Sequence, residues 1–199
     1  VAYSGGTIAN NTIVGRSNAN GIVIKDNTNG DASNIVISGN YVEAKLGILL
    51  EAGNAHSVVG NNVIATTGGG IWANGGTNHN ITANTISTTT AEPIVSASVA
   101  TVISDNVLSN TSTTAGILLT SASTDTIISG NKVTGATVGI ITYGSGSDIC
   151  GNRVASGNGA GISLQAVDAV VSANRIAATS GEGILVSYQK AAITGNRIT

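Results

Sequence analysis

The sequence has 199 residues but no phenylalanine, no methionine and only one proline, and just 9% of its residues are charged. A core must therefore be built from small and branched aliphatic side chains, and apolar residues, at 41%, are numerous enough for one. This composition excludes an intrinsically disordered chain, which would be poor in apolar residues and strongly charged. The formal net charge of −2 gives no field that would attract nucleic acid or an anionic membrane surface.

Three further absences limit the setting of the chain. No run of 18 or more apolar residues occurs, so we expect no transmembrane helix. Cys150 is the only cysteine, which rules out an internal disulfide, and we expect it to behave as a small buried hydrophobe. The first residues lack a signal-peptide pattern and an initiating methionine, so we expect a processed chain or a segment of a larger protein.

Glycine and asparagine, by contrast, are frequent and recur at regular intervals. The repeating unit is Ile/Val-x-x-Asn-x-Ile/Val, followed by a variable stretch and then Gly-Ile-x-aliphatic. Intervals of 21 to 29 residues separate the recurring asparagines, which are Asn11, Asn40, Asn61, Asn84, Asn106, Asn131, Asn152, Asn174 and Asn196. Pro93 once replaces the glycine of the second half, which recurs as Gly21, Gly47, Gly70, Gly116, Gly139, Gly161 and Gly183.

Columns of aliphatic residues accompany this repeat. Two-residue alternation within short segments, broken by Gly, Asn and Ser, is typical of strands and turns, and helical spacing is absent. About 22 residues per unit allow three short strands and three turns, which predicts an all-β solenoid of about nine coils with three parallel sheets. We expect the recurring Asn to adopt a left-handed backbone conformation and to hydrogen-bond to its copies in adjacent coils.

The asparagine column, segments such as Gly47-Ile-Leu-Leu50 and the coil length resemble the right-handed parallel β-helix superfamily, the pectate-lyase-like fold. Its members include polysaccharide lyases, polygalacturonase-like hydrolases, alginate epimerases and bacteriophage tailspikes. The resemblance covers Thr7–Thr199 and implies a single β-helix domain over residues 1–199. Because the repeat runs to both ends without a capping helix, we expect this domain to be a segment of a larger protein.

The resemblance does not extend to the enzyme motifs of the superfamily. The Tyr-Gly-(Phe/Ile)-Asp-Pro-His signature of alginate epimerases has its nearest counterpart in Tyr143-Gly144-Ser-Gly-Ser-Asp148, which lacks Pro and His. The Asn-Thr-Asp, Asp-Asp and Gly-His-Gly motifs of polygalacturonase-like enzymes do not occur. Since the fold alone does not define an activity, the sequence leaves open whether the protein is an enzyme.

One outward column of the third strand is apolar at seven of its eight positions. It consists of Val23, Leu49, Trp72, Val95, Leu118, Ile141, Ser163 and Leu185, and we call it the apolar column. A contiguous exposed apolar stripe favours a protein interface, and we expect a homotrimer or another protein partner to bind there. Cover by a loop of the same chain and a glycan-binding surface are the alternatives.

The strand after the recurring Asn carries cations at its outward position in four consecutive coils. These residues, which we call the basic column, are Lys132, Arg153, Arg175 and Arg197. Successive coils lie about 4.8 Å apart, so the column predicts a binding track for an anionic polysaccharide or an acidic partner. A solvated face tied to local acids or backbone carbonyls is the alternative.

A second candidate site lies where His56 and His79, five residues before their asparagines, should be neighbours on adjacent coils. We expect Trp72, Asn74, Glu51 and Glu92 to lie close to them. An aromatic ring with a few polar groups is suited to sugar binding, which gives Trp72, Asn74 and His56 as ligand-binding candidates. Glu51, Glu92 and His79 are weaker catalytic candidates for acid–base cleavage of a glycoside. No third metal ligand has credible spacing, so we expect no metal at the two histidines.

Asp125, Asp148 and Asp168 fall near the start of a strand in three coils. Aspartate at such a turn bonds its own backbone, and a weak Ca²⁺ site is the alternative. We therefore expect no cofactor other than such a Ca²⁺ ion.

The favoured function is the β-helix body of a phage tailspike or similar cell-surface fibre, which binds host surface polysaccharide and in some members processes it. Its location would be extracellular or on the virion surface, with no nucleic-acid or membrane partner. A secreted polysaccharide lyase, hydrolase or epimerase is the first alternative, and a purely structural or engineered solenoid is the second.

Overall fold

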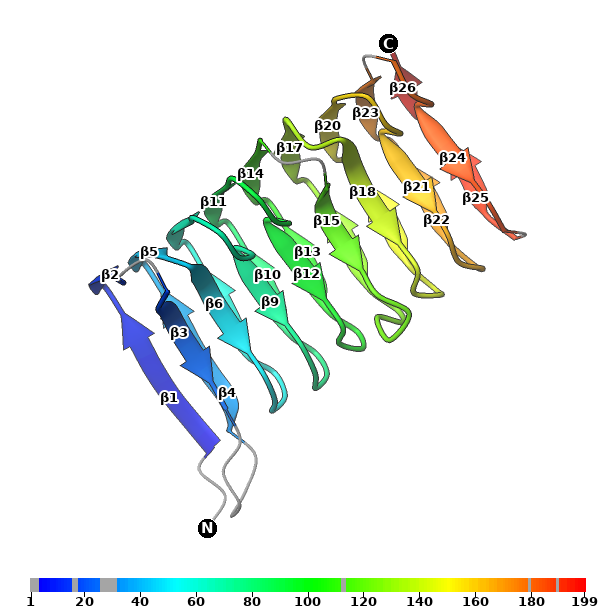
Figure 1. Ribbon diagram of the computed structural model, residues 1–199. Coiled ribbons are helices and arrows are strands. Elements are labelled where there is room, and N and C mark those ends of the chain that lie inside the picture. Colours follow the sequence, from blue (N-terminus) through cyan, green and yellow to red (C-terminus); the bar gives the residue numbers. More distant parts are fainter. Residues whose placement is uncertain (1–3, 16–17, 26–31, 112–113, 179, 189) are drawn as a thin grey trace.

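The computed structural model describes residues 4–15, 18–25, 32–111, 114–178, 180–188 and 190–199, and every regular element in them is a β-strand. The backbone winds into an elongated tube with the two termini at opposite ends (Figure 1). Each coil contributes one strand to each of three parallel sheets, which confirms the predicted right-handed parallel β-helix. Eight described coils have three strands, and a ninth has two.

The three sheets are named A, B and C in the order in which the chain visits them. Sheet A contains β1 (Ser4–Ala9), β4 (Ser33–Ser38), β7 (Ser57–Val59), β10 (Asn80–Thr82), β13 (Val102–Ser104), β16 (Ile127–Ser129), β19 (Asp148–Cys150), β22 (Val170–Ser172) and β25 (Ala192–Thr194). Sheet B contains β2 (Thr12–Val14), β5 (Tyr41–Ala44), β8 (Asn62–Ala65), β11 (Thr85–Thr88), β14 (Val107–Asn110), β17 (Lys132–Thr134), β20 (Arg153–Ser156), β23 (Arg175–Ala178) and β26 (Arg197–Ile198). Sheet C contains β3 (Asn20–Ile24), β6 (Leu46–Leu50), β9 (Ile71–Ala73), β12 (Ile94–Ser96), β15 (Ala115–Leu119), β18 (Val138–Thr142), β21 (Ile162–Leu164) and β24 (Ile184–Val186).

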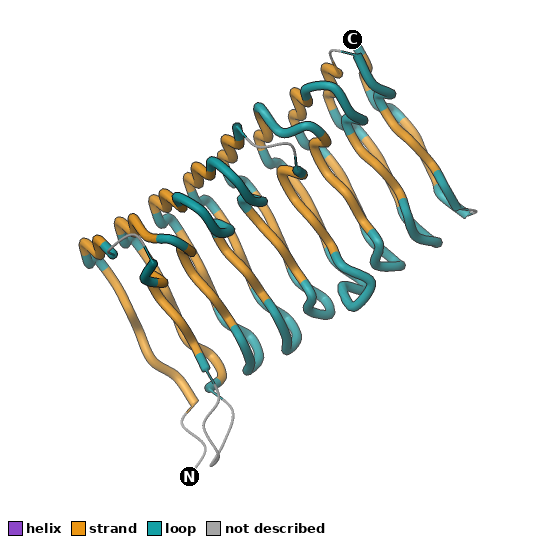
Figure 2. The backbone as a smooth tube through the Cα atoms, in the orientation of Figure 1, coloured by secondary structure: helices purple, strands orange, loops and turns teal. Residues whose placement is uncertain are grey.

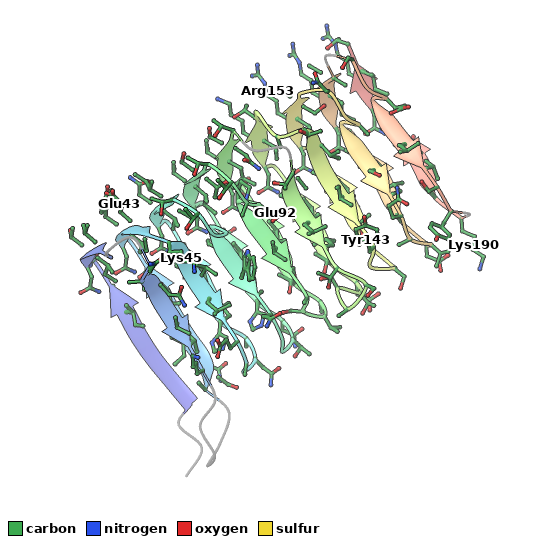
Figure 3. The ribbon with its side chains drawn as sticks, viewed as in Figure 1. Glu43, Lys45, Glu92, Tyr143, Arg153 and Lys190 are labelled. Atoms are coloured by element: carbon green, nitrogen blue, oxygen red, sulfur yellow. The ribbon has the colours of Figure 1, made fainter. Side chains whose placement is uncertain are left out.

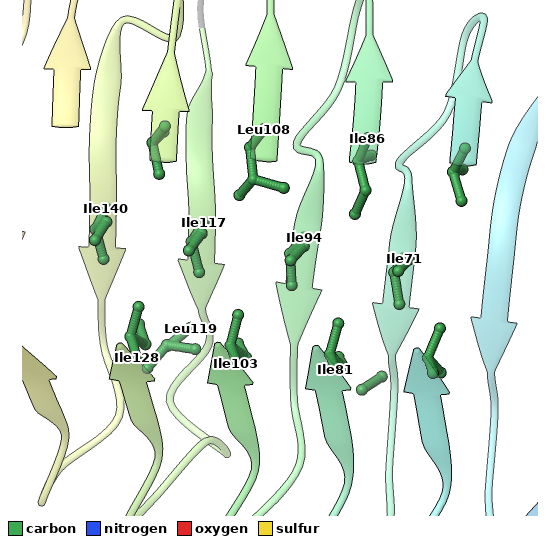
Figure 4. Packing of buried hydrophobic residues seen from close by; sticks show 14 of the residues in the cluster. Ile71, Ile81, Ile86, Ile94, Ile103, Leu108, Ile117, Leu119, Ile128 and Ile140 are labelled. Atoms are coloured by element: carbon green, nitrogen blue, oxygen red, sulfur yellow. The ribbon is translucent and has the colours of Figure 1, made fainter. Parts of the chain in front are cut away.

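The interior of the tube is filled by columns of aliphatic side chains from all three sheets (Figure 4). In a central coil these are Ile128 of sheet A, Val133 of sheet B and Ile140 of sheet C, each fully buried. The parallel register places each of them directly beside its copy in the next coil. Because the side chains of a strand alternate between faces, burying one face leaves the intervening residues outside, and these carry the candidate sites.

The recurring glycine of sheet C has a steric cause. A Cβ atom on Gly139 would lie 2.1 Å from Cγ1 of Val154 and 2.4 Å from the carbonyl oxygen of Gly161, both in the next coil. The same overlap with the sheet B interior residue of the next coil recurs at Gly21, Gly47, Gly70, Gly116, Gly161 and Gly183. Glycine is therefore required because two backbones and an aliphatic side chain meet there.

The recurring asparagines form a continuous hydrogen-bonded column at the corner between sheets A and B, which we call the asparagine ladder. In its central part, Nδ2 of Asn131 donates to Oδ1 of Asn152 at 3.0 Å and to the carbonyl oxygen of Ile103 at 2.8 Å. Oδ1 of Asn131 accepts from the backbone N–H and from Nδ2 of Asn106. The ladder Asn is buried in seven consecutive coils, from Asn40 to Asn174.

The expected left-handed conformation belongs to a different residue. In all nine coils the residue with positive φ is the one before the ladder Asn: Asn10, Gly39, Gly60, Ala83, Asp105, Gly130, Gly151, Ala173 and Gly195. The preceding residue makes the sharp corner, and this turn directs the Asn side chain inward. There its amide group hydrogen-bonds to a backbone N–H and a carbonyl group of the preceding coil. The prediction that the ladder Asn itself is left-handed was therefore wrong.

The turns line up from coil to coil along the edges of the tube (Figure 2). Within the described residues there is no helix long and apolar enough to cross a bilayer.

Candidate functional site

The basic column lies on the outer face of sheet B. Lys132, Arg153, Arg175 and Arg197 are the first residues of β17, β20, β23 and β26, and they are direct register partners. All four side chains are exposed, and Arg153 projects away from the tube (Figure 3). With about 4.8 Å per coil, four cations span roughly 14 Å along the tube axis.

None of these cations has an acidic partner within the described part of the chain, where the only ion pair joins Lys25 and Glu51. The next outward positions on the same strands are Thr134, Ala155 and Ala177, whose short side chains leave the column accessible. The described residues thus contain no ion pair between the basic column and a local carboxylate. Four like charges in one row form a positive strip on this face of the tube.

The second candidate cluster is divided between the outside and the inside of the tube. Glu51 and Asn74 occupy equivalent outward positions, since the backbone N–H groups of both donate to carbonyls of the preceding coil just after β6 and β9. Nζ of Lys25, one coil earlier in this column, lies 3.1 Å from Oε2 of Glu51. Lys25 was not among the predicted site residues, although it follows Ile22 by three residues, as Glu51 follows Ile48.

Glu92 lies at the other end of the sheet C strands. Its carbonyl oxygen accepts from the N–H of Gly70. Glu92 precedes Ile94 by two residues, whereas Glu51 follows Ile48, which occupies the same register position two coils earlier, by three residues. At about 3.3 Å per residue, the two carboxylates are separated by roughly 16 Å along the strand and by two further coils. Acid–base pairs of glycosidases lie at most about 10 Å apart, so the expected proximity of Glu51 and Glu92 was wrong.

Trp72 is half-buried on the outer face of sheet C. Its indole covers the backbone of Gly69, because a Cβ atom there would lie 1.8 Å from Nε1. Nε1 is buried without a hydrogen-bond partner, so part of the ring faces the protein rather than solvent. The ring shares its outer face with Asn74, which is exposed.

His56 and His79 are neighbours, as the spacing predicted, but they point into the tube. Their side chains are 0% and 1% exposed, and their rings stack in parallel with centroids 5.1 Å apart. They follow the left-handed residues Ala55 and Asn78, which turn the chain inward at the corner between sheets C and A. Neither ring can touch a sugar bound outside, so the predictions of His56 as a ligand-binding residue and His79 as a catalytic residue do not agree with this burial.

The apolar column is in register along the outside of sheet C, as predicted. Leu49 is 8% exposed and Leu185 is 36% exposed, and the other apolar members lie between these values. Stacking of each side chain on its copies in adjacent coils provides part of this cover.

The three aspartates do not share one position. Asp125 and Asp168 have φ of 55° and 59° and make the left-handed corner before sheet A, whereas Asp148 lies within β19. Among the described residues, no group of three His, Cys, Asp or Glu side chains could hold a metal ion. A turn role accounts for Asp125 and Asp168, because aspartate tolerates this conformation.

Lowering the pH is expected to destabilise the fold through His79. Burial lowers the pKa of this imidazole below its ordinary value of 6.5; the hydrogen bond to the Gly75 carbonyl opposes the shift, and the charge of His56 adds to it. Because the unfolded chain takes up the proton more readily, the stabilisation is complete above about pH 6.5 and is lost as the pH falls. We expect the thermal midpoint, measured by circular dichroism, to be lower at about pH 5 than at about pH 7.

A variant with His56→Asn and His79→Asn serves as the control for this titration. Its thermal midpoint should be lower at neutral pH but flatter across the same range, since no imidazole remains to be protonated. An equally steep pH dependence in the variant would assign the effect to other groups.

Comparisons with known proteins place this geometry in a family. Residues 46–199 match the family described as periplasmic copper-binding protein (NosD). A crystal structure of a mutant of the periplasmic alginate epimerase AlgG is similar, with a TM-score of 0.71 and 14% identity over 84% of this chain and 46% of that chain. A protein of Geobacillus virus E2, ORF18, gives a TM-score of 0.42 and 8% identity over 99% of this chain and 52% of that chain. No curated protein matches the chain significantly.

The chain thus spans about half the length of the solved structures that it resembles. The likeness to the epimerase is one of fold, because the identity is low. The family match covers more than three quarters of the sequence, so the chain belongs to the NosD family of β-helix proteins.

Proposed function

We propose that this chain is a polysaccharide-binding β-helix that works outside the cytoplasm, and that its basic column binds an acidic polysaccharide. The observation that carries the proposal is the row of four exposed cations in register, without a described acidic partner. Each cation contributes only a small free energy to an exposed ion pair, so binding depends on a ligand that engages several coils at once. A linear polymer with one carboxylate or sulfate on each sugar meets this requirement.

Two comparisons support the setting of this proposal. The matched family and the structurally similar epimerase are both described as periplasmic, and the epimerase is described as acting on alginate, an acidic polysaccharide. The chain itself is short of charge elsewhere, with 8 basic and 10 acidic residues in total. Half of its lysines and arginines therefore lie in this single column.

A polysaccharide panel tests the proposal directly. The purified chain is titrated by calorimetry with alginate, polygalacturonate and heparin, and with dextran as a neutral polymer of similar size. We expect measurable binding to the acidic polymers, weakened as salt is raised, and none to dextran. Binding to dextran alone, or to no polymer, would contradict the proposal.

The narrower interpretation, a fibre body such as that of a tailspike, adds assembly through the apolar column. Three copies that meet along this column would cover Leu185, Val95 and their neighbours, which are only partly covered within one chain. Light scattering of the same samples should then give the mass of a trimer. A monomer at micromolar concentration would remove the fibre part of the proposal while leaving glycan binding intact.

The two carboxylates predicted for the enzyme alternative do not form a pair. Glu51 is paired with Lys25, and Glu92 lies at the far end of the strands. An assay of reducing ends and unsaturated products on each bound polymer distinguishes binding from turnover. Product formation that is lost in Glu51→Gln would restore the enzyme interpretation.

A further inference from the structure

Two histidines and one cysteine are the only residues in the sequence with the soft or nitrogen ligands that copper prefers, because methionine is absent. Copper is named in the description of the matched family, so the fit of these residues to a copper ion can be tested on their geometry. Cys150 lies in β19, three coils beyond His79, which directly precedes β10, and it cannot join the histidines in one site.

Both nitrogens of each imidazole are already in use. Nδ1 of His56 accepts the backbone N–H of Ile35 at 3.2 Å, and Nδ1 of His79 accepts the N–H of His56 at 3.2 Å. Since Nδ1 is the acceptor, Nε2 carries the proton and donates to a carbonyl oxygen, that of Ala52 for His56 and that of Gly75 for His79. Neither ring therefore offers a lone pair to a metal.

The orientation of the rings is also unsuitable for a shared ion. The ring planes are parallel within 3°, with centroids 5.1 Å apart. The lone pairs of an imidazole lie in the ring plane, so those of two stacked rings run side by side and do not converge on one point. A metal bound by both would require a nitrogen of each ring at about 2 Å, which stacked rings do not provide.

We infer that His56 and His79 form an imidazole ladder that joins successive coils, and that this pair is not a copper site. The pattern of bonds is that of the asparagine ladder: the backbone N–H of Asn131 donates to Oδ1 of Asn152 in the next coil, and the N–H of His56 donates to Nδ1 of His79 in the next coil. The imidazoles thus hold together the corner between sheets C and A, as the amides hold the corner between sheets A and B.

The surroundings of the rings are built for this ladder. Gly53 and Gly76, three residues before each histidine, have φ of 88° and 81° and lie over the Nε2 atoms, where a Cβ would come within 2.6 Å and 3.0 Å. In the next coil Thr101 takes the position of the histidines, and its buried Oγ1 has no hydrogen-bond partner. The ladder therefore ends at His79.

Copper titrations of the intact chain test the inference. Cu(II) binding is followed by electron paramagnetic resonance and Cu(I) binding by competition with a chromogenic chelator, in the wild type, in His56→Asn/His79→Asn and in the matched control Thr101→Asn. We expect the affinity for copper to differ less than about twofold between the wild type and the double variant. A stoichiometric site that weakens tenfold or more in the double variant but not in Thr101→Asn would overturn the inference.

Nitrogen-15 spectra of the wild-type imidazoles give a second readout that does not depend on folding of the variant. We expect both rings to be neutral with the proton on Nε2, and their shifts to remain unchanged after one equivalent of Cu(I) or of Zn(II). Loss of the Nε2 proton or a shift of both rings on metal addition would contradict the ladder.

Discussion

Replacing Asn131 with alanine should lower the free energy of unfolding by about 3–5 kcal/mol. The substitution removes the acceptor of the Asn106 backbone N–H and the side-chain donor to the Ile103 carbonyl. It also takes one hydrogen bond from Nδ2 of Asn106 and one from Oδ1 of Asn152, and a buried polar group that loses its partner costs about 1–3 kcal/mol. Bulk solvent does not reach these groups, because Asn131 is 0% exposed and its neighbours in the ladder are buried as well. Chemical denaturation followed by circular dichroism measures the change.

Asn62→Ala is the matched control for this loss. Asn62 directly follows the ladder residue Asn61, but its side chain lies on the exposed face of β8. We expect a change of about 0.5 kcal/mol or less, as for most surface substitutions. Similar losses in both variants would show that the ladder contributes no more than ordinary strand propensity.

The ladder could be located from sequence because the motif Ile/Val-x-x-Asn-x-Ile/Val recurs in each coil although the turn lengths differ. Strand residues such as Ile128 and Val133 also keep strict alternation, so their inward direction was predictable. The left-handed corner was assigned to the wrong residue because Gly, Ala, Asp and Asn all occupy it. Ala83 and Ala173 have positive φ although alanine disfavours it, so the hydrogen bonds of the ladder impose this conformation from outside the turn.

The same difference between strand and turn residues explains which candidate site residues were placed correctly. Arg153 and Arg175 lie in strands, where alternation fixes the exposed face, and the structure places them as expected. His79 lies in a turn, where strand alternation does not apply. Its neighbour His56 was therefore predictable from the repeat, but the inward direction of its side chain was not. Glu51 and Glu92 were expected to be close because their coils are near one another. Their separation along the strand direction follows only from the register of the sheet C strands.

Neutralising the basic column should weaken binding of an acidic polysaccharide by roughly 10- to 100-fold. Exposed ion pairs contribute about 0.2–1 kcal/mol each, so changing all four residues to Gln costs about 1–4 kcal/mol, and the middle of this range corresponds to the 10- to 100-fold loss. A single Arg153→Gln should cost only about two- to fivefold. The remaining affinity should depend less on salt, because fewer charges are paired with the polymer.

If the basic column is a binding track, affinity for the polymer depends on where positive charge is removed and not only on how much is removed. Arg153→Gln/Arg175→Gln and Lys45→Gln/Lys190→Gln each remove two positive charges, and all four side chains are exposed, but only the first pair lies in the basic column. We expect the first variant to bind the polymer several-fold more weakly than the second, with unchanged thermal midpoints in both. Equal losses would mean that the polymer responds to net charge alone. A polymer held by the column must run along the tube axis, since its anionic groups can meet successive cations only by crossing from coil to coil at about 4.8 Å per step.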